Sequence, residues 1–319
     1  MYNILNFVHS QAHDYKTQKS IFNIITGKKS HQTFFDASSQ HLLSFYHSLP
    51  NLKYQSFERI LTETNDNHTN LTLKCNNKHT YDSMRNTFNA LQLLIQTISC
   101  DIHKFYQFTP VSQQLQVQKQ VKKLFNTIKK QQETDNFLAE LQQLLTAIHD
   151  TNGKTYIHYY LQGYNESMYT RQQVSLIENI PQHLLMELEY NDLVEMVTQL
   201  ENNSKYPLLH QLVLHPPLLN KTEQTLHSIL AQQSLNDILR EQNVKINTIE
   251  DHLIELFIKG YLSDYETYVT TQMMGDFSHY YPEHSNERLR DMKARFSDLS
   301  YFQLKLLIVG YQRGELNAT

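Results

Sequence analysis

The sequence predicts a mainly α protein: an N-terminal winged-helix-like and helical-bundle region, followed by a C-terminal helix-turn-helix domain. Gly and Pro occur only seven times each in 319 residues, although the many tight turns of a large β-sandwich or barrel need them. Hydrophobic residues make up 40% of the chain, which is enough for a sizeable core. Strand-like alternation is rare, and a chain of this length usually forms about two domains.

Overall charge and cysteine content argue against a uniformly basic nucleic-acid-binding protein and against a zinc-cluster protein. The formal net charge is -4 and the pI is about 6.5, so any contact with nucleic acid must come from a local basic patch. Cys75 and Cys100 are the two cysteines, too few for a zinc cluster and typical of a reducing compartment.

The N-terminus lacks the basic start and apolar run of a signal peptide, and no stretch approaches the ~20 apolar residues of a membrane helix. We therefore expect a cytoplasmic protein without a membrane partner.

The first 80 residues predict three helices and a small β element. A helical region ends at Gly27, Ser30 caps the next helix, and Lys53–Thr64 forms the third. Thr69–Cys75 then alternates apolar and polar residues with the period of a half-buried strand. Together these elements predict a winged-helix-like module at about residues 15–80.

Two lysines flank the start of the second of these helices. Lys28 and Lys29 precede Ser30, at a helix end whose unpaired N–H groups and dipole favour an anion such as phosphate. These three residues are candidate DNA contacts. Ordinary solvated lysines in a turn would show the same pattern.

Residues 81–149 predict two or three long helices with a basic surface. An apolar face steps by four, three and four residues through Val117, Val121, Leu124 and Ile128. The lysines on the remaining surface are Lys119, Lys122, Lys123, Lys129 and Lys130. Such a run can neutralise phosphates without reading sequence, and Lys119, Lys122 and Lys123 are our candidate DNA contacts. A solvated helix face is the alternative.

Residues 155–214 are again helical and rich in tyrosine. Tyrosines can stack on single-stranded bases, although mixed spacing is more often a sign of core packing. His215-Pro-Pro217 then interrupts the helical pattern, because consecutive prolines cannot continue a helix. We place the main boundary there, with an N-terminal region at 1–217 and a helix-turn-helix domain at 218–319.

The C-terminal domain starts with a helix over Thr222–Gln233, followed by a short helix that Ser234 caps. After a brief connection, Asn247–Gly260 predicts a longer amphipathic helix in which Asn247 and Glu250 form the starting cap. A short helix, a tight turn and a longer helix form a helix-turn-helix, and a plain αα-hairpin would look similar. Further helices are expected at Asp264–Met274, at Ser285–Phe296 and after Ser300.

Several segments resemble a known family. The C-terminal segments are Ser234-Leu-Asn-Asp-Ile-Leu239, Asn247-Thr-Ile-Glu-Asp-His-Leu-Ile-Glu-Leu256, Leu289-Arg-Asp-Met-Lys293 and Leu299-Ser-Tyr-Phe-Gln-Leu-Lys305. They resemble the helicase helix-turn-helix domain, which is found at the C-termini of RecQ-like helicases and in the bacterial YpbB family. The N-terminal segment Ser20–Thr33, with Asp36-Ala37, is also similar to YpbB proteins.

The resemblance implies a non-enzymatic, DNA-binding companion of a RecQ-like helicase, acting in DNA repair or recombination. The family pattern places Thr248 and His252 on the recognition-like helix as DNA contacts, and we add Lys245 and Asn247 near its start. The same helix carries carboxylates, which repel phosphate and favour a protein surface. Asp251 and Glu255 are therefore candidate contacts to the partner.

Two other functions are compatible with the sequence, and the sequence lacks the common motifs of an enzyme. The chain can instead be a scaffold that binds the helicase with little DNA affinity of its own, or, less in keeping with the sequence, a transcription regulator. We find no complete P-loop, no His-Glu-x-x-His pair and no Gly-x-Ser-x-Gly elbow. We therefore expect no catalytic residues, no metal site and no cofactor.

Overall fold

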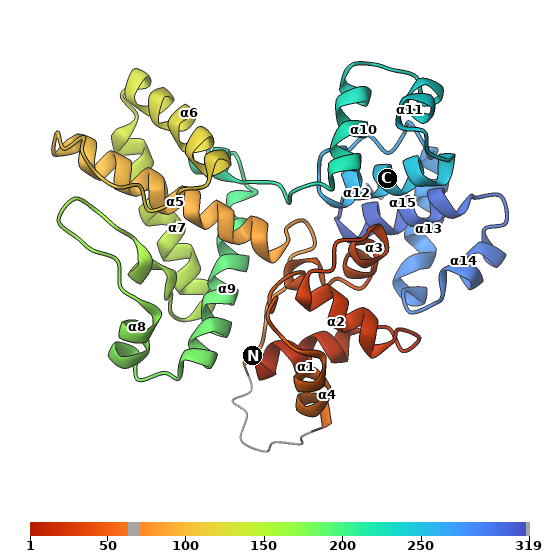
Figure 1. Cartoon of the computed structure of the whole chain (residues 1–319), viewed down its shortest axis with the longest axis horizontal. Helices are drawn as coiled ribbons and strands as arrows, with labels where there is room; N and C mark the ends of the chain where they lie inside the picture. Colours follow the sequence, from red (N-terminus) through yellow and green to blue (C-terminus); the bar gives the residue numbers. More distant parts are fainter. Residues whose placement is uncertain (63–70, 317–319) are drawn as a thin grey trace. The chain divides into compact units, whose positions relative to one another are not determined.

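The computed structural model describes residues 1–62 and 71–316, and these residues form fifteen α-helices without a β-strand (Figure 1). The mainly α prediction is confirmed. The described residues divide into two compact units: the first contains residues 1–5, 71–74 and 82–214, and the second contains residues 6–62, 75–81 and 215–316. The predicted ranges 1–217 and 218–319 divide the chain differently, because N-terminal helices pack onto the helix-turn-helix helices in the second unit.

The first unit is built around the long helices of the middle of the chain. Its elements are α5 (Tyr81–Ile102), α6 (Leu115–Gln131), α7 (Thr134–Asn152), η2 (Ile157–Tyr160), α8 (Arg171–Glu178), α9 (Gln182–Leu200) and η3 (Leu209–Leu212). Helices α7 and α9 pack together. Each of these helices carries a buried carboxylate that bonds to the backbone at the start of a short 3-10 helix. Glu140 of α7 accepts from the N–H of Leu209 in η3 at 2.9 Å, and Asp192 of α9 accepts from the N–H of Tyr156, just before η2, at 2.5 Å.

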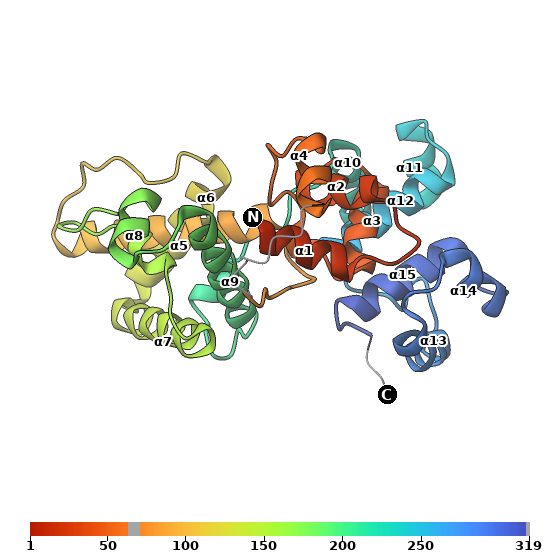
Figure 2. The same cartoon turned by 90° about the horizontal axis from the view of Figure 1, so that it is seen from below.

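The second unit has one helix at its centre. Helix α1 (Tyr2–Gln11) begins in the first unit and continues into the second. The other elements are α2 (Gln18–Thr26), α3 (His31–Ser39), η1 (Leu43–Phe45), α4 (Tyr54–Thr62), α10 (Asn220–Leu230), α11 (Leu235–Gln242), α12 (Ile246–Ile258), α13 (Thr271–His284), α14 (Leu289–Arg295) and α15 (Tyr301–Gln312). Helix α12 contacts α3, α10 and α15, as Figures 1 and 2 show.

Helices α2, α3 and α4 form where the three N-terminal helices were predicted, but the predicted wing strand does not form. Residues 63 and 64, the end of the third predicted helix, lie outside the described residues. Gly27 ends α2 in a left-handed conformation (φ 75°), and Ser30 caps α3, as expected. Residues 71–75 are not a strand, and residues 69 and 70 lie outside the described residues. The side chain of Asn191 on α9 accepts from the N–H of Lys74 and donates to the carbonyl of Thr72. These backbone groups are therefore satisfied by a side chain of the first unit, and residues 71–75 add no wing to the predicted module.

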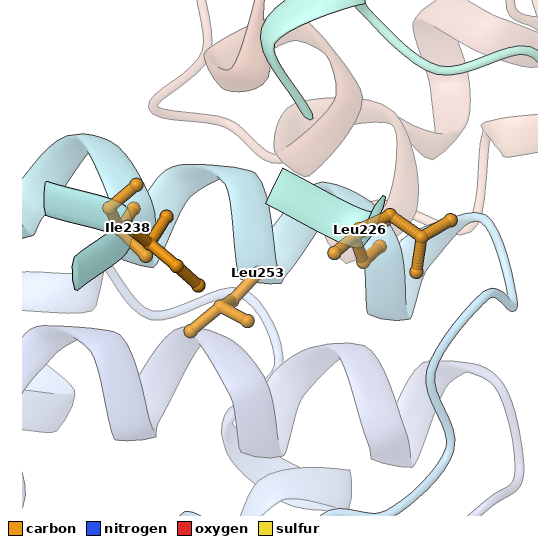
Figure 3. Close-up of a cluster of buried hydrophobic side chains, with 5 residues drawn as sticks. Leu226, Ile238 and Leu253 are labelled. Atoms are coloured by element: carbon orange, nitrogen blue, oxygen red, sulfur yellow. The ribbon is translucent and has the colours of Figure 1, made fainter. Parts of the chain in front are cut away.

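The helix-turn-helix has a small hydrophobic core of its own. Figure 3 shows Leu226 of α10, Ile238 of α11 and Leu253 of α12 packed together, and Ile249 and Leu256 complete the buried cluster. The three residues from α12 are spaced by four and three, so they share one face of that helix. This cluster fixes α10 and α11 against α12.

A second face of α12 carries a buried polar network. Glu255 and Lys259 lie one turn apart, are 1% and 2% exposed, and form an ion pair of 2.5 Å. Glu255 also accepts from the hydroxyl of Thr222 (2.5 Å) and the N–H of Leu219 (2.9 Å), and its carboxylate lies 3.1 Å from Nε2 of His31. The network therefore ties α12 to α3, to α10 and to the segment that precedes α10.

His252 belongs to the same interior network. It is 2% exposed, its Nδ1 lies 2.7 Å from the hydroxyl of Thr225, and its ring packs against that of His31. Burial, together with the nearby His31, lowers the pKa of His252 from 6.5 to about 4, although Glu255 opposes this shift. Burial alone would raise the pKa of Glu255, but the hydrogen bond from His31 and the charge of Lys259 outweigh it and lower that pKa to about 2.

The first prediction concerns the ion pair. Glu255→Gln keeps the size of the side chain but leaves the ammonium group of Lys259 buried without a counter-charge. We expect the free energy of unfolding to fall by about 3 to 5 kcal/mol in urea titrations followed by circular dichroism. Glu250→Gln is the matched control, because Glu250 lies on the same helix but is only half-buried, and we expect a change of less than about 0.5 kcal/mol. Equal effects of the two substitutions would contradict the structural role of the pair.

The second prediction concerns pH. Because the pKa of His252 is lower in the folded protein, the unfolded chain binds a proton more readily, and stability falls as the pH drops from above 6.5 towards 4. Between pH 8 and pH 5 we expect wild type to lose about 2 kcal/mol more stability than His252→Gln. Glu255 titrates below this window, since its stabilising effect is present above pH 4.5 and is lost towards pH 2. Parallel pH profiles for the two proteins would show that His252 is not held neutral.

Candidate nucleic-acid interface

The helix-turn-helix consists of α11, a tight turn and α12. Ser234 caps α11 by accepting from the N–H of Asp237, and Asn243 ends the helix in a left-handed conformation (φ 51°). The prediction that Asn247 caps the second helix is wrong: Lys245 is the capping position, and Asn247 is the second residue of α12. Val244 packs against the hydrophobic cluster, so the chain turns and enters the helix earlier than the polar residues indicated.

The start of α12 is its accessible part. Lys245, Ile246 and Asn247 are exposed and Thr248 is half-buried, whereas all residues from His252 to Lys259 are buried. In DNA-binding helix-turn-helix domains, the first residues of the second helix contact base edges in the major groove. Three of the predicted DNA contacts, Lys245, Asn247 and Thr248, thus lie together where such contacts are made.

The burial of two other predicted site residues corrects the sequence-based interpretation. We expected His252 to contact DNA because of the family resemblance, and Glu255 to contact a partner protein because a carboxylate repels phosphate. Both side chains instead lie in the interior, where they bond to Thr225, Thr222 and Lys259. Neither reaches a surface that DNA or a partner can touch.

The charges around the accessible end nearly balance. Asp251, the other predicted partner contact, is 43% exposed at its side chain and lies 3.2 Å from Nζ of Lys305 on α15. This ion pair reduces the repulsion between α12 and a phosphate backbone. Arg240 and Lys245 are exposed nearby in the sequence, as are Asp237 and Glu241. The uncharged side chains of Asn247 and Thr248 therefore lie among charges of both signs.

The lysines before α3 lie next to the buried network. Lys28 and Lys29 are exposed, and Ser30 uses its hydroxyl to accept from the N–H of Thr33. The next residue, His31, packs against the ring of His252 with centroids 5.3 Å apart. Lys28, Lys29 and Ser30 are therefore close to the middle of α12, at a distance along the helix of about 10 Å from Lys245.

The sequence did not reveal Lys221 as a member of this basic group. It is exposed at the start of α10, and its charge acts on His252. No local charge cluster marks it, because folding alone brings α10 beside α3. The carboxylate of Glu255 already lies at the N-terminus of α10, where it accepts from the N–H of Leu219 and the hydroxyl of Thr222, and its negative charge opposes a phosphate there.

The lysines of α6 form a separate surface in the first unit. The predicted apolar face is confirmed, because Val117, Val121, Leu124 and Ile128 are all buried. Lys119, Lys122 and Lys123 are exposed, and none forms an ion pair with a residue that the structure describes. Helix α6 carries five lysines and no acidic residue, so this face attracts anions.

The described residues contain no group of three or more His, Cys, Asp or Glu side chains that can hold a metal ion. Within residues 1–62 and 71–316, no helix combines the length and the apolar composition needed to cross a membrane.

Comparison with known proteins bears on the C-terminal region. Residues 221–308, which run from α10 into α15, match the model of a family described as a helix-turn-helix domain. No curated protein and no solved structure matches the chain. The match confirms the predicted helix-turn-helix, and the C-terminal region of this chain is thus similar in sequence to helix-turn-helix domains.

Proposed function

We propose that the protein is a non-enzymatic DNA-binding accessory protein that partners a RecQ-like helicase in DNA repair or recombination in the cytoplasm. The observation that carries DNA binding is the helix-turn-helix at 221–308, whose second helix has its first turn accessible. The helicase supplies the ATP-driven motor. Its place in the proposal rests on the resemblance of both ends of the chain to YpbB proteins.

The chemistry of the accessible turn suits DNA. The amide of Asn247 can accept from and donate to the edge of an adenine, and the hydroxyl of Thr248 can bond to a base or a phosphate. Lys245 carries a positive charge at the same end and can neutralise one phosphate. Lys28, Lys29 and Ser30 offer a second, sequence-independent contact to the backbone.

The third prediction tests this surface. Lys245→Glu reverses one charge at the accessible end, so we expect the affinity for a duplex DNA to fall about tenfold at low salt. The slope of log affinity against log salt should decrease in magnitude by about one. Fluorescence anisotropy of labelled DNA over a salt series measures both quantities.

Lys53→Glu is the matched control, because Lys53 is another exposed lysine of the second unit and precedes α4 rather than the helix-turn-helix. Equal losses for the two variants would assign the effect to overall charge and would contradict a DNA contact at Lys245. A transcription regulator would instead select one sequence from a pool of random duplexes.

A specific observation favours a second candidate function, that of a scaffold which binds the helicase. Large apolar side chains are exposed around the helix-turn-helix, namely Leu230, Leu235 and Ile246. Asp237 and Glu241, on the exposed side of α11, are unfavourable next to phosphate. Exposed apolar groups with an acidic rim are typical of a protein–protein contact.

The fourth prediction separates the two functions. In the double variant Leu235→Ser/Ile246→Ser, we expect the complex with a RecQ-like helicase to weaken about tenfold, because the loss of two large apolar side chains from an interface can remove about 1.4 kcal/mol of binding free energy. Co-purification of the full chain with the helicase measures complex formation, and anisotropy measures DNA affinity. Loss of the complex without loss of DNA binding supports the scaffold role of this surface. Unchanged co-purification would exclude it as the helicase contact.

A further inference from the structure

Two loops are held against the C-terminal half of α5 in the first unit. The buried side chain of Gln96 donates to the carbonyl of Thr109 (3.1 Å) and accepts from the N–H of Val111 (3.0 Å), which anchors the loop that follows α5. The hydroxyl of Ser99 accepts from the N–H of Tyr164 at 2.9 Å, which anchors the loop before α8. Side chains of one helix, α5, thus anchor both of the loops that carry these aromatic residues.

These loops expose large aromatic rings. Tyr106 is 68% exposed, Tyr164 is 42% exposed and Phe105 is 41% exposed. Tyr164 stacks on His103 with centroids 4.5 Å apart and an interplanar angle of 17°, and Phe105 lies 5.4 Å from Tyr164. Packing fixes the rings of Tyr164 and Phe105, and Tyr106, the next residue after Phe105, leaves most of its ring open to solvent. An exposed cluster of this kind in a folded protein usually marks a binding surface.

The basic face of α6 adjoins this aromatic cluster. Lys129 on α6 forms an ion pair of 2.6 Å with Asp101 on α5, so the C-terminal ends of the two helices lie side by side. The hydrogen bond to Asp101 is the main reason why the pKa of Lys129 is raised, and the nearby phenol of Tyr106 adds to the shift. Tyr106 follows Asp101 by only five residues, so the ion pair between Asp101 and Lys129 also brings Tyr106 close to the end of the lysine row.

The charge of this region points to a polyanion. Residues 101–131 contain six lysines and a single acidic residue, Asp101, whose charge is balanced by Lys129. The lysines from 119 to 130 extend for about 16 Å along α6, on the side opposite its buried stripe. In the loop before α8, Glu166 is the single acidic residue between 161 and 170.

We propose that the aromatic cluster of Phe105, Tyr106 and Tyr164, together with the lysine face of α6, forms a binding site for single-stranded DNA. Exposed rings suit unpaired bases, because each base has a face that can stack, and a row of lysines follows the phosphates. Duplex DNA keeps its base faces stacked inside the helix and cannot use the rings. This inference rests on the proposed DNA-binding function and adds a second surface, distinct from the helix-turn-helix, with its own preference for strand form.

Anisotropy with the full chain and two labelled probes, a twenty-nucleotide oligo-dT and a twenty-base-pair duplex, tests the site. Tyr106→Leu removes the ring but keeps apolar bulk, and we expect oligo-dT affinity to fall about tenfold. Tyr106→Phe keeps the ring, so its affinity should stay within about twofold of wild type. The double variant Lys122→Glu/Lys123→Glu should weaken oligo-dT binding and reduce the salt slope by about 1.4.

Tyr301→Leu is the matched aromatic control, because Tyr301 is an exposed tyrosine of the second unit and should not affect oligo-dT binding. Tyr106→Leu should leave duplex affinity unchanged, and Lys245→Glu should reduce duplex affinity but not oligo-dT affinity. If Tyr106→Leu binds oligo-dT as tightly as wild type does, the single-strand site is overturned. Duplex binding by the same protein would still support the proposed function. Tighter binding of oligo-U RNA than of oligo-dT would overturn its assignment to DNA. Absence of binding to both probes would overturn both proposals.

Discussion

The buried carboxylate of Glu255 is the constraint on which the second unit depends. It needs several donors at once, and it takes them from Lys259 on its own helix, from Thr222 and Leu219 at the start of α10, and from the His31 side of α3. Helix α12 cannot slide against α3 or α10 without leaving a charge buried and unpaired. This requirement explains why helices from both ends of the chain form one compact unit.

The same constraint determines what the helix-turn-helix can offer to a ligand. Because most of α12 is used to hold α3, α10 and α15 together, a partner can reach its first turn around Asn247 but not His252. The first turn of α12 offers a small polar contact, and the nearly balanced charges around it add little to the affinity for DNA. The lysine face of α6 and the exposed ring of Tyr106 belong to the other unit, and they have the charge and the aromatic surface that this turn lacks. The two proposed surfaces are thus complementary in their chemistry.

Local signals predicted local structure well. Ser30, Ser234 and Ser300 cap helices as expected, because a capping hydroxyl bonds to N–H groups only a few residues away. The buried stripe of α6 was also predictable, since its period depends on helix geometry alone. The cap at Asn247 was not predictable in this way, because Val244 packs against the core formed with α10 and α12, and α12 starts at Ile246. The expected wing strand failed for a similar reason: its backbone is bonded by α9, more than a hundred residues away.

The sequence by itself determined that the chain is helical, where most helices of the helix-turn-helix lie, and which surface is rich in lysine. Helix period and capping residues carry this information, because they act over a few residues. Only the tertiary structure decided which polar residues are accessible. His252 and Glu255 fall on a polar face by their spacing, but α3, from more than two hundred residues earlier, covers that face. Spacing along one helix cannot show which distant segment will pack against it, so the division between surface and interior was settled by the fold.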